Sequence, residues 1–218
     1  MRIAIGISGA FLFIMAYYAA LDYIDRARDI GLKRRGRLIV SKFVWLTGAA
    51  GFCILLWFGY RVFWQMPFPV SLMQCVLLWG MSVAAVTDYR KHLIPNGILF
   101  MMLIIWAAIV GICVILATEY GLGLLFQSLI GAATGGLIFL LCYLLSRRQL
   151  GAGDVKLSFV MGLYLTGQRI VGAIFYGIVL CLIYSVIQLL RRKIGLKDGV
   201  PLAPFLYGGV LITFGILF

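Results

Sequence analysis

Residues 96–117 read NGILFMMLIIWAAIVGICVILA and contain no charged side chain. A helix needs about 20 predominantly apolar residues to cross the hydrocarbon core of a bilayer, and this stretch is long enough. Stretches of similar character lie at about 3–21, 39–60, 69–87, 121–146, 170–190 and 201–218. The 218-residue chain is 64% apolar and 12% charged, whereas soluble domains are nearer half apolar and a quarter charged. The sequence therefore predicts an all-α, polytopic membrane helix bundle.

The basic residues predict how the chain is threaded through the membrane. A further apolar stretch, 155–166, is short for a span, since a run of that length is often re-entrant or interfacial. With 155–166 counted as a span, there are eight spans, and fifteen of the nineteen Lys and Arg residues fall in four loops on one side. These loops are 22–38, 88–95, 147–156 and 191–200. Because Lys and Arg concentrate in cytoplasmic loops, we expect eight transmembrane segments with both termini outside.

The remaining composition excludes several function classes. The net charge of +12 comes from short basic runs between apolar stretches, so we interpret these runs as determinants of membrane topology. Attraction to anionic membrane lipids is then a by-product, and we expect no nucleic-acid partner. The five cysteines lie singly inside apolar stretches, and their spacing suggests neither a zinc site nor a disulfide framework. We expect no metal and no cofactor.

The chain is expected to have two parts. Residues 1–64 form an N-terminal extension with two transmembrane helices, and residues 65–218 form the core that carries the chemistry. The stretch 3–21 could instead be a cleaved signal peptide, but its removal would place the six basic residues of 22–38 outside. Gly131 and Gly135, four residues apart within one stretch, predict a close helix–helix contact.

Two aspartates stand at junctions between apolar spans and inner loops. Asp88 follows the span 69–87, and Asp154 precedes the stretch 155–166. An ionisable residue at a membrane span is costly and indicates function. Two carboxylates at hydrogen-bonding distance do not easily ionise together, so such a pair holds one proton and can act as general acid and base. Gly151 and Gly153 permit positive φ and close backbone approach beside Asp154.

Other interpretations of these residues remain open. Asp154 could be a helix N-cap after a glycine turn, and Asp88 could be a helix-end residue paired with Arg90 or Lys91. An ion- or proton-coupled transporter would also place two aspartates near membrane spans. A third possibility is a non-catalytic subunit of a secretion machine. His92, beside Lys91, could be a solvent-exposed loop residue without any acid–base role.

Three segments carry a resemblance to a known family. The segment from Asp88 to Ile94-Pro95-Asn96 resembles the first catalytic motif of the type IV prepilin peptidases, which are membrane aspartyl proteases. The segment Gly151-Ala152-Gly153-Asp154-Val155-Lys156-Leu157 resembles their second motif, G-x-G-D. The segment from Pro201 to Leu206, which includes Pro204, resembles a proline-bearing stretch near the family's C-terminus.

The resemblance covers about 65–218, a six-helix core, and it implies a function. Asp88 and Asp154 would be the catalytic dyad, which cleaves the basic leader of a prepilin or pseudopilin precursor at the cytoplasmic face of the inner membrane. Lys156 fits the motif, although it could instead be a basic residue that serves only to set the membrane topology. Pro95 and Asn96 are expected to end the loop and begin the next span. The cysteine-free segment 22–38 argues against N-methylation of the substrate. In this respect the chain resembles the compact members that serve Flp/Tad-type pili, or an archaeal preflagellin peptidase. The oligomeric state is not predicted.

Overall fold

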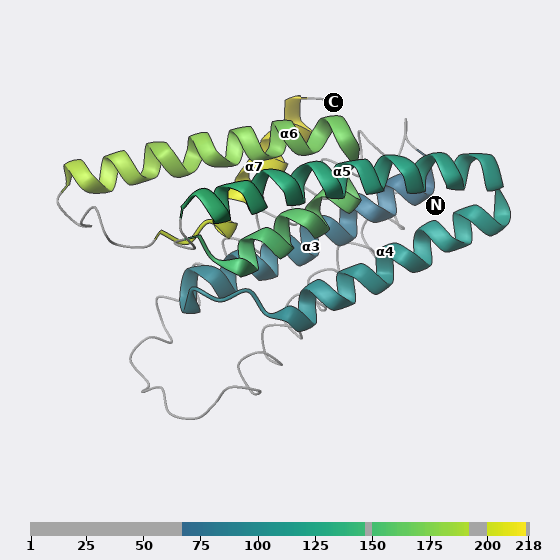
Figure 1. Ribbon diagram of the computed structural model, residues 1–218, viewed down its shortest axis with the longest axis horizontal. Helices are drawn as coiled ribbons and strands as arrows, with labels where there is room; N and C mark the ends of the chain where they lie inside the picture. Colours follow the sequence, from purple (N-terminus) through teal and green to yellow (C-terminus); the bar gives the residue numbers. More distant parts are fainter. Residues whose placement is uncertain (1–66, 147–149, 192–199, 217–218) are drawn as a thin grey trace, which may run out of the picture. The chain divides into compact units, whose positions relative to one another are not determined.

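The computed structural model describes residues 67–146, 150–191 and 200–216, and within these ranges it is entirely helical (Figure 1). The helices are α3 (Phe68–Lys91), α4 (Asn96–Leu116), α5 (Thr118–Leu145), α6 (Ala152–Leu190) and α7 (Ala203–Ile216). The predicted spans 3–21 and 39–60 and the predicted boundary at residue 64 lie outside the described residues. The chain divides into two units, Met1–Ser71 and Leu72–Phe218, and the site lies in the second.

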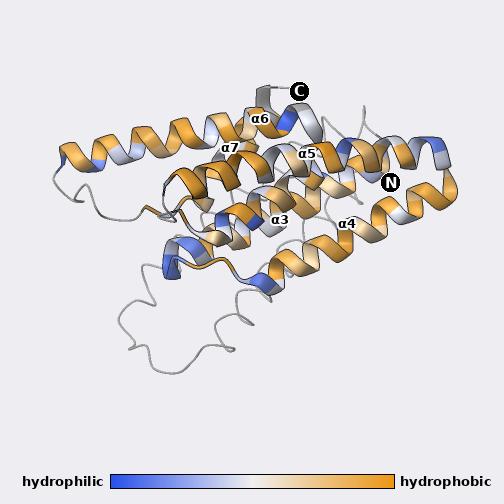
Figure 2. Cartoon of the chain, in the orientation of Figure 1, coloured by the Kyte–Doolittle hydropathy of each residue, from blue (hydrophilic) through white to orange (hydrophobic). Residues whose placement is uncertain are grey.

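Four segments of the described part are long and apolar enough to cross a membrane. They are Phe68–Lys91, Asn96–Leu116, Thr118–Leu145 and Arg169–Leu190, and Ala203–Phe214 is a shorter apolar helix. Apolar residues cover the bodies of these helices, and polar residues gather at helix ends (Figure 2). Helix α3 is largely buried, whereas α4, α5 and Arg169–Leu190 expose most of their apolar side chains, as lipid-facing helices do. The chain is therefore a multi-pass membrane protein.

A turn of one residue joins α4 to α5. Ala117 ends α4 and precedes α5 with φ −147° and ψ 78°, so the two helices leave the turn side by side. Gly121 lies in the first turn of α5 against the backbone of Cys113 and Val114, where a Cβ would overlap backbone atoms. Only glycine fits this position without moving the two helices apart.

Glycines also allow α5 to approach the first half of α6. A Cβ on Gly131 would collide with the carbonyl oxygen of Gly162, and a Cβ on Gly162 would collide with that of Gly131. One turn further along α5, the Ser158 hydroxyl donates a 2.6 Å hydrogen bond to the Gly135 carbonyl. The predicted close contact at Gly131 and Gly135 is confirmed, and its partner is the helix that opens with the G-x-G-D motif.

Helix α6 reverses direction at Thr166, where φ is 62° and ψ is 171°. A Cβ on Gly135 would lie 2.7 Å from the Ser158 carbonyl oxygen and 3.0 Å from Ile170 Cγ1. Twelve residues of straight helix span about 18 Å, so the chain must fold back between Ser158 and Ile170. Figure 1 shows the two halves of α6 as separate segments. The short stretch 155–166 is thus a helix distinct from the span that follows it.

Helix α7 packs against the second half of α6. Gly209 lies against the backbone of Ala173 and Gly177, and Gly177 lies against Leu206. The rings of Tyr184 and Phe205 stack in a tilted arrangement with centroids 5.1 Å apart. This contact holds the beginning of α7 beside the end of α6, and it thereby fixes the position of the α7 N-terminus.

Candidate active site

Asp88 lies one turn before the end of α3 and is buried, with 6% of its surface exposed. Its carbonyl oxygen accepts a 2.8 Å hydrogen bond from the N–H of His92. His92 has φ 48°, so the chain leaves the helix there in a left-handed conformation, which ends α3. The His92 side chain is exposed at this helix end. The Asp88 carboxylate therefore lies inside the protein, just before the chain reaches the surface.

The N-terminus of α7 faces Asp88. The backbone N–H of Ala203, the first residue of α7, donates a 3.0 Å hydrogen bond to Asp88 Oδ2. The Leu202 carbonyl accepts the first bonds of the helix, from the N–H groups of Phe205 and Leu206. The first N–H groups of a helix have no partner within it, and the helix dipole is positive at this end. Both effects stabilise a negative charge on Asp88.

Pro204 explains why the helix begins at this place. It is the second residue of α7, where the N–H that proline lacks would have had no partner inside the helix. Pro201 precedes the helix and is partly buried. The two prolines therefore favour a helix start that leaves the Ala203 N–H free to reach Asp88.

Asp154 is the third residue of α6 and is partly buried. Gly151 is the N-cap of α6 and makes no side-chain cap, so the interpretation of Asp154 as the N-cap is wrong. Asp154 Oδ1 is buried and, among the described residues, has no hydrogen-bond partner. Burial and the negative charge of Asp88 raise the pKa of the Asp154 carboxyl to about 6, while a hydrogen bond from the Gly151 backbone opposes the shift. The structure thus places Asp88 and Asp154 close enough to interact electrostatically, although their helices are far apart in the sequence.

The two glycines of the G-x-G-D motif are explained by close approach. A Cβ on Gly151 would lie 3.0 Å from Asp154 Oδ2, and a Cβ on Gly153 would lie 3.3 Å from Ile94 Cβ. Neither glycine has a positive φ; that of Gly151 is −68°. The expectation of close backbone approach is confirmed, and positive φ is not used.

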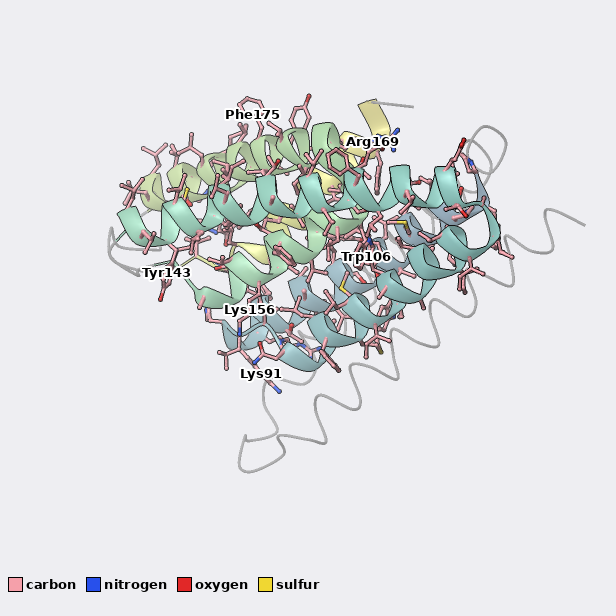
Figure 3. All side chains as sticks on the ribbon, turned by 45° about the vertical axis from the view of Figure 1, so that its right-hand side comes forward. Lys91, Trp106, Tyr143, Lys156, Arg169 and Phe175 are labelled. Carbon is pink, nitrogen blue, oxygen red and sulfur yellow. The ribbon has the colours of Figure 1, made fainter. Side chains whose placement is uncertain are left out.

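A second contact joins the same two loops. Lys156 Nζ donates a 3.2 Å hydrogen bond to Asn96 Oδ1, and this links the fifth residue of α6 to the first residue of α4. Pro95 is the N-cap of α4, so Pro95 and Asn96 end the loop and begin the helix as predicted. Figure 3 shows Lys91 and Lys156 at one end of the helices and Arg169 towards the other.

The sequence motifs therefore lie close together in space, and they are joined by one group that the sequence did not predict. The pairs Asp88–Ala203, Lys156–Asn96 and Gly153–Ile94 connect the three motif segments. The missed group is the backbone N–H of Ala203, which no side-chain pattern reveals. The prolines on either side of it were the available signal, because proline marks the start of a helix. Within the described ranges, no three His, Cys, Asp or Glu side chains gather closely enough to hold a metal ion. The expectation that no cofactor is needed stays a prediction.

Comparisons with known proteins agree with these motifs. Residues 75–186 match the type IV leader peptidase family. The chain is also 29% identical, over 141 residues, to the prepilin leader peptidase/N-methyltransferase of Bacillus subtilis (strain 168). This alignment covers 61% of the chain and 54% of that protein, so the chain spans about half the length of its curated relative. No solved structure matches the chain.

Proposed function

Because the chain belongs to the type IV leader peptidase family, we propose that it is a membrane aspartyl endopeptidase with Asp88 and Asp154 as its catalytic dyad. The observation that carries the proposal is the proximity of the buried Asp88 carboxyl group at the end of α3 to the partly buried Asp154 carboxyl group at the start of α6. A carboxyl pair that shares one proton can remove a proton from water and donate a proton to the scissile carbonyl oxygen.

The proposed substrate is a prepilin or pseudopilin precursor, and the reaction removes its leader peptide. The relative from Bacillus subtilis carries the name of such a peptidase. The leader of such a substrate is basic, and the loops of this chain are basic too, so we propose that recognition rests on the apolar helix that follows the leader. We propose that N-methylation is absent, because residues 22–38 contain no cysteine. This feature fits a compact Flp/Tad-like member.

The proposed location is the inner membrane, with the dyad at its cytoplasmic face. The loops 88–95, 147–156 and 191–200 carry basic residues, which favours their cytoplasmic placement. With 1–64 as a two-span extension and 65–218 as a six-span core, this gives eight spans and both termini outside. The reversal at Thr166 supports counting residues 155–166 as a separate span.

The proposal is tested by co-expression with a candidate prepilin. Asp88→Asn and Asp154→Asn should each abolish conversion of the precursor to the shorter pilin, read by mass spectrometry, while the protein still inserts into the membrane. Each change replaces a group that gives or takes a proton by one that does neither, and a loss of at least about 10³-fold is expected.

Glu119→Gln is the matched control. It removes one carboxylate from the exposed first turn of α5 and should leave cleavage unchanged. Normal processing by both aspartate variants would overturn the proposal and favour a non-catalytic role. Ion or proton flux that depends on both aspartates, without any change in pilin mass, would favour a transporter.

A further inference from the structure

We infer that the two carboxyl groups have different roles: Asp88 carries the negative charge and activates water, while Asp154 carries the proton and polarises the scissile carbonyl. The inference rests on the proposed function and deepens it, because a coupled pair of aspartates does not reveal from sequence which member holds the proton. The asymmetry comes from what each carboxyl group contacts.

Asp88 is surrounded by groups that stabilise its ionised form. Its Oδ2 accepts a 3.0 Å hydrogen bond from the Ala203 N–H, at the positive end of the α7 dipole. Hydrogen bonds to a charged acceptor are about twice as strong as those between neutral groups. A charge on His92 and the Leu202 backbone act in the same direction, and together these groups oppose the cost of burial, which is the largest single effect on this carboxyl group. Since Asp88 is buried, these donors replace water as the solvent of the carboxylate.

Asp154 is placed where a negative charge is poorly stabilised. Its Oδ1 is buried and finds no donor among the described residues, so an ionised oxygen there would lose hydration without replacement. The charged group that acts on it from another helix is the like-charged Asp88. The positive end of α6 and the Gly151 backbone favour ionisation, but burial and repulsion outweigh them, since the pKa of the Asp154 carboxyl is raised to about 6.

This assignment gives a balanced hydrolysis. The Asp88 carboxylate takes a proton from water as the water oxygen attacks the scissile carbonyl carbon, and the Asp154 carboxyl donates its proton to the carbonyl oxygen. A tetrahedral gem-diol forms. Asp88 then gives its proton to the leaving amide nitrogen as the C–N bond breaks, and the Asp154 carboxylate takes a proton from one diol hydroxyl. Both products leave, and the starting protonation is restored.

Infrared spectroscopy of the purified full chain in lipid nanodiscs locates the proton without any substrate. At pH 5, wild type should show the C=O band of a protonated carboxyl group. Asp154→Asn should lose this band, and Asp88→Asn should retain it. The reverse pattern would overturn the inference. Because no substrate is involved, a failure of the proposed peptidase activity does not change this readout.

The role of the Ala203 N–H is tested by Ala203→Pro, which deletes this one donor. Ala203 occupies the first helical position, which proline tolerates. Loss of one hydrogen bond to a charged group should move the acidic limb of the kcat/KM–pH profile upward by about one pH unit. Ala203 is completely buried, so Ala203→Val is the matched control, because it adds similar bulk and keeps the N–H.

The valine variant should keep the acidic limb at its wild-type position, whatever its rate. Equal limbs in the proline variant and wild type would overturn the assignment of Asp88 as the ionised member. If proline prevents folding, the infrared comparison of the two asparagine variants still decides the question. Cleavage by wild type together with a proton on Asp88 would reject the inference alone, whereas absence of cleavage would reject the proposed function.

Discussion

At the scale of single residues, the site depends on how closely backbone and carboxyl groups approach one another. Gly151 leaves room for Asp154 Oδ2, and Gly153 leaves room for Ile94. The sequence predicted that both glycines are important, but it did not distinguish between two reasons for them, positive φ and close backbone approach. Which of two uses a glycine serves depends on its neighbours in space, and these are not visible in a motif.

Gly151→Ala should lower kcat/KM by about 10-fold or more. The added methyl group would lie 3.0 Å from Asp154 Oδ2, so the carboxyl group must shift by a few tenths of an ångström, and small displacements of reacting groups reduce rates strongly. Gly97→Ala is the control, since a Cβ there meets nothing within 4 Å and the position also lies in the first turn of a helix. The measurement is cleavage of a prepilin peptide, and equal rates in both variants would contradict the explanation.

The raised pKa of Asp154 also predicts how stability depends on pH. The ordinary pKa is 3.8 and that in the folded protein is about 6, so the folded state binds the proton more tightly than the unfolded state. Stability from this group is fully present below pH 4 and is lost as the pH rises through 6. The loss is at most about 3 kcal/mol, because one pKa unit corresponds to about 1.4 kcal/mol.

Thermal unfolding in detergent between pH 4 and 8 measures this effect. Asp154→Asn should flatten the decrease of Tm with pH and should be more stable than wild type at pH 8, because it removes a charge that is unfavourable in the fold. Glu119→Gln, on an exposed turn, should follow the wild-type curve. Parallel curves for wild type and Asp154→Asn would show that Asp154 has an ordinary pKa in the folded protein.

At the scale of helices, hydropathy predicted where the helices lie along the sequence, but it did not predict which helices contact one another. The stretches at 96–117 and 121–146 correspond closely to α4 (Asn96–Leu116) and α5 (Thr118–Leu145), because a membrane span is a local property of about 20 residues. The basic loop 191–200 required a reversal somewhere after 154, but no residue pattern marks Thr166 as the place. The contact of α7 with Asp88 joins residues 115 apart, and a local pattern contains no information about such a distance.

Gly131→Ala should destabilise the contact between α5 and the first half of α6. Its Cβ would collide with the carbonyl oxygen of Gly162, a backbone atom that cannot turn aside, so the helices must separate. Overpacking of this kind costs about 1–3 kcal/mol. Gly123→Ala lies on the same helix with nothing within 4 Å and should be neutral or slightly stabilising. Denaturation in detergent distinguishes the two, and equal stabilities would contradict the close contact.

At the scale of the whole molecule, the proposed topology and the proposed site require each other. The proposed dyad, the Lys156–Asn96 bond and the start of α7 all lie at ends of helices for which the charge pattern favours cytoplasmic placement. The helix before Thr166 comprises about 14 residues and is about 21 Å long, which is shorter than the roughly 30 Å hydrocarbon core. A short helix beside the proposed dyad would let water reach the two carboxyl groups to which we assign hydrolysis of the peptide bond.

Single cysteines in a background without the five native ones test this arrangement. A membrane-impermeant thiol reagent applied to intact cells should label Glu119→Cys and Arg169→Cys. It should label Ser146→Cys and Arg191→Cys only after the membrane is opened. The reason is that the proposed topology has the chain cross the bilayer within α5, again before Thr166 and once more within Arg169–Leu190. If Arg169→Cys reacts only in opened membranes while Glu119→Cys reacts in intact cells, residues 152–165 enter the membrane and return. The cytoplasmic placement of α7, and with it the contact between α7 and Asp88 at the inner face, would then be untenable.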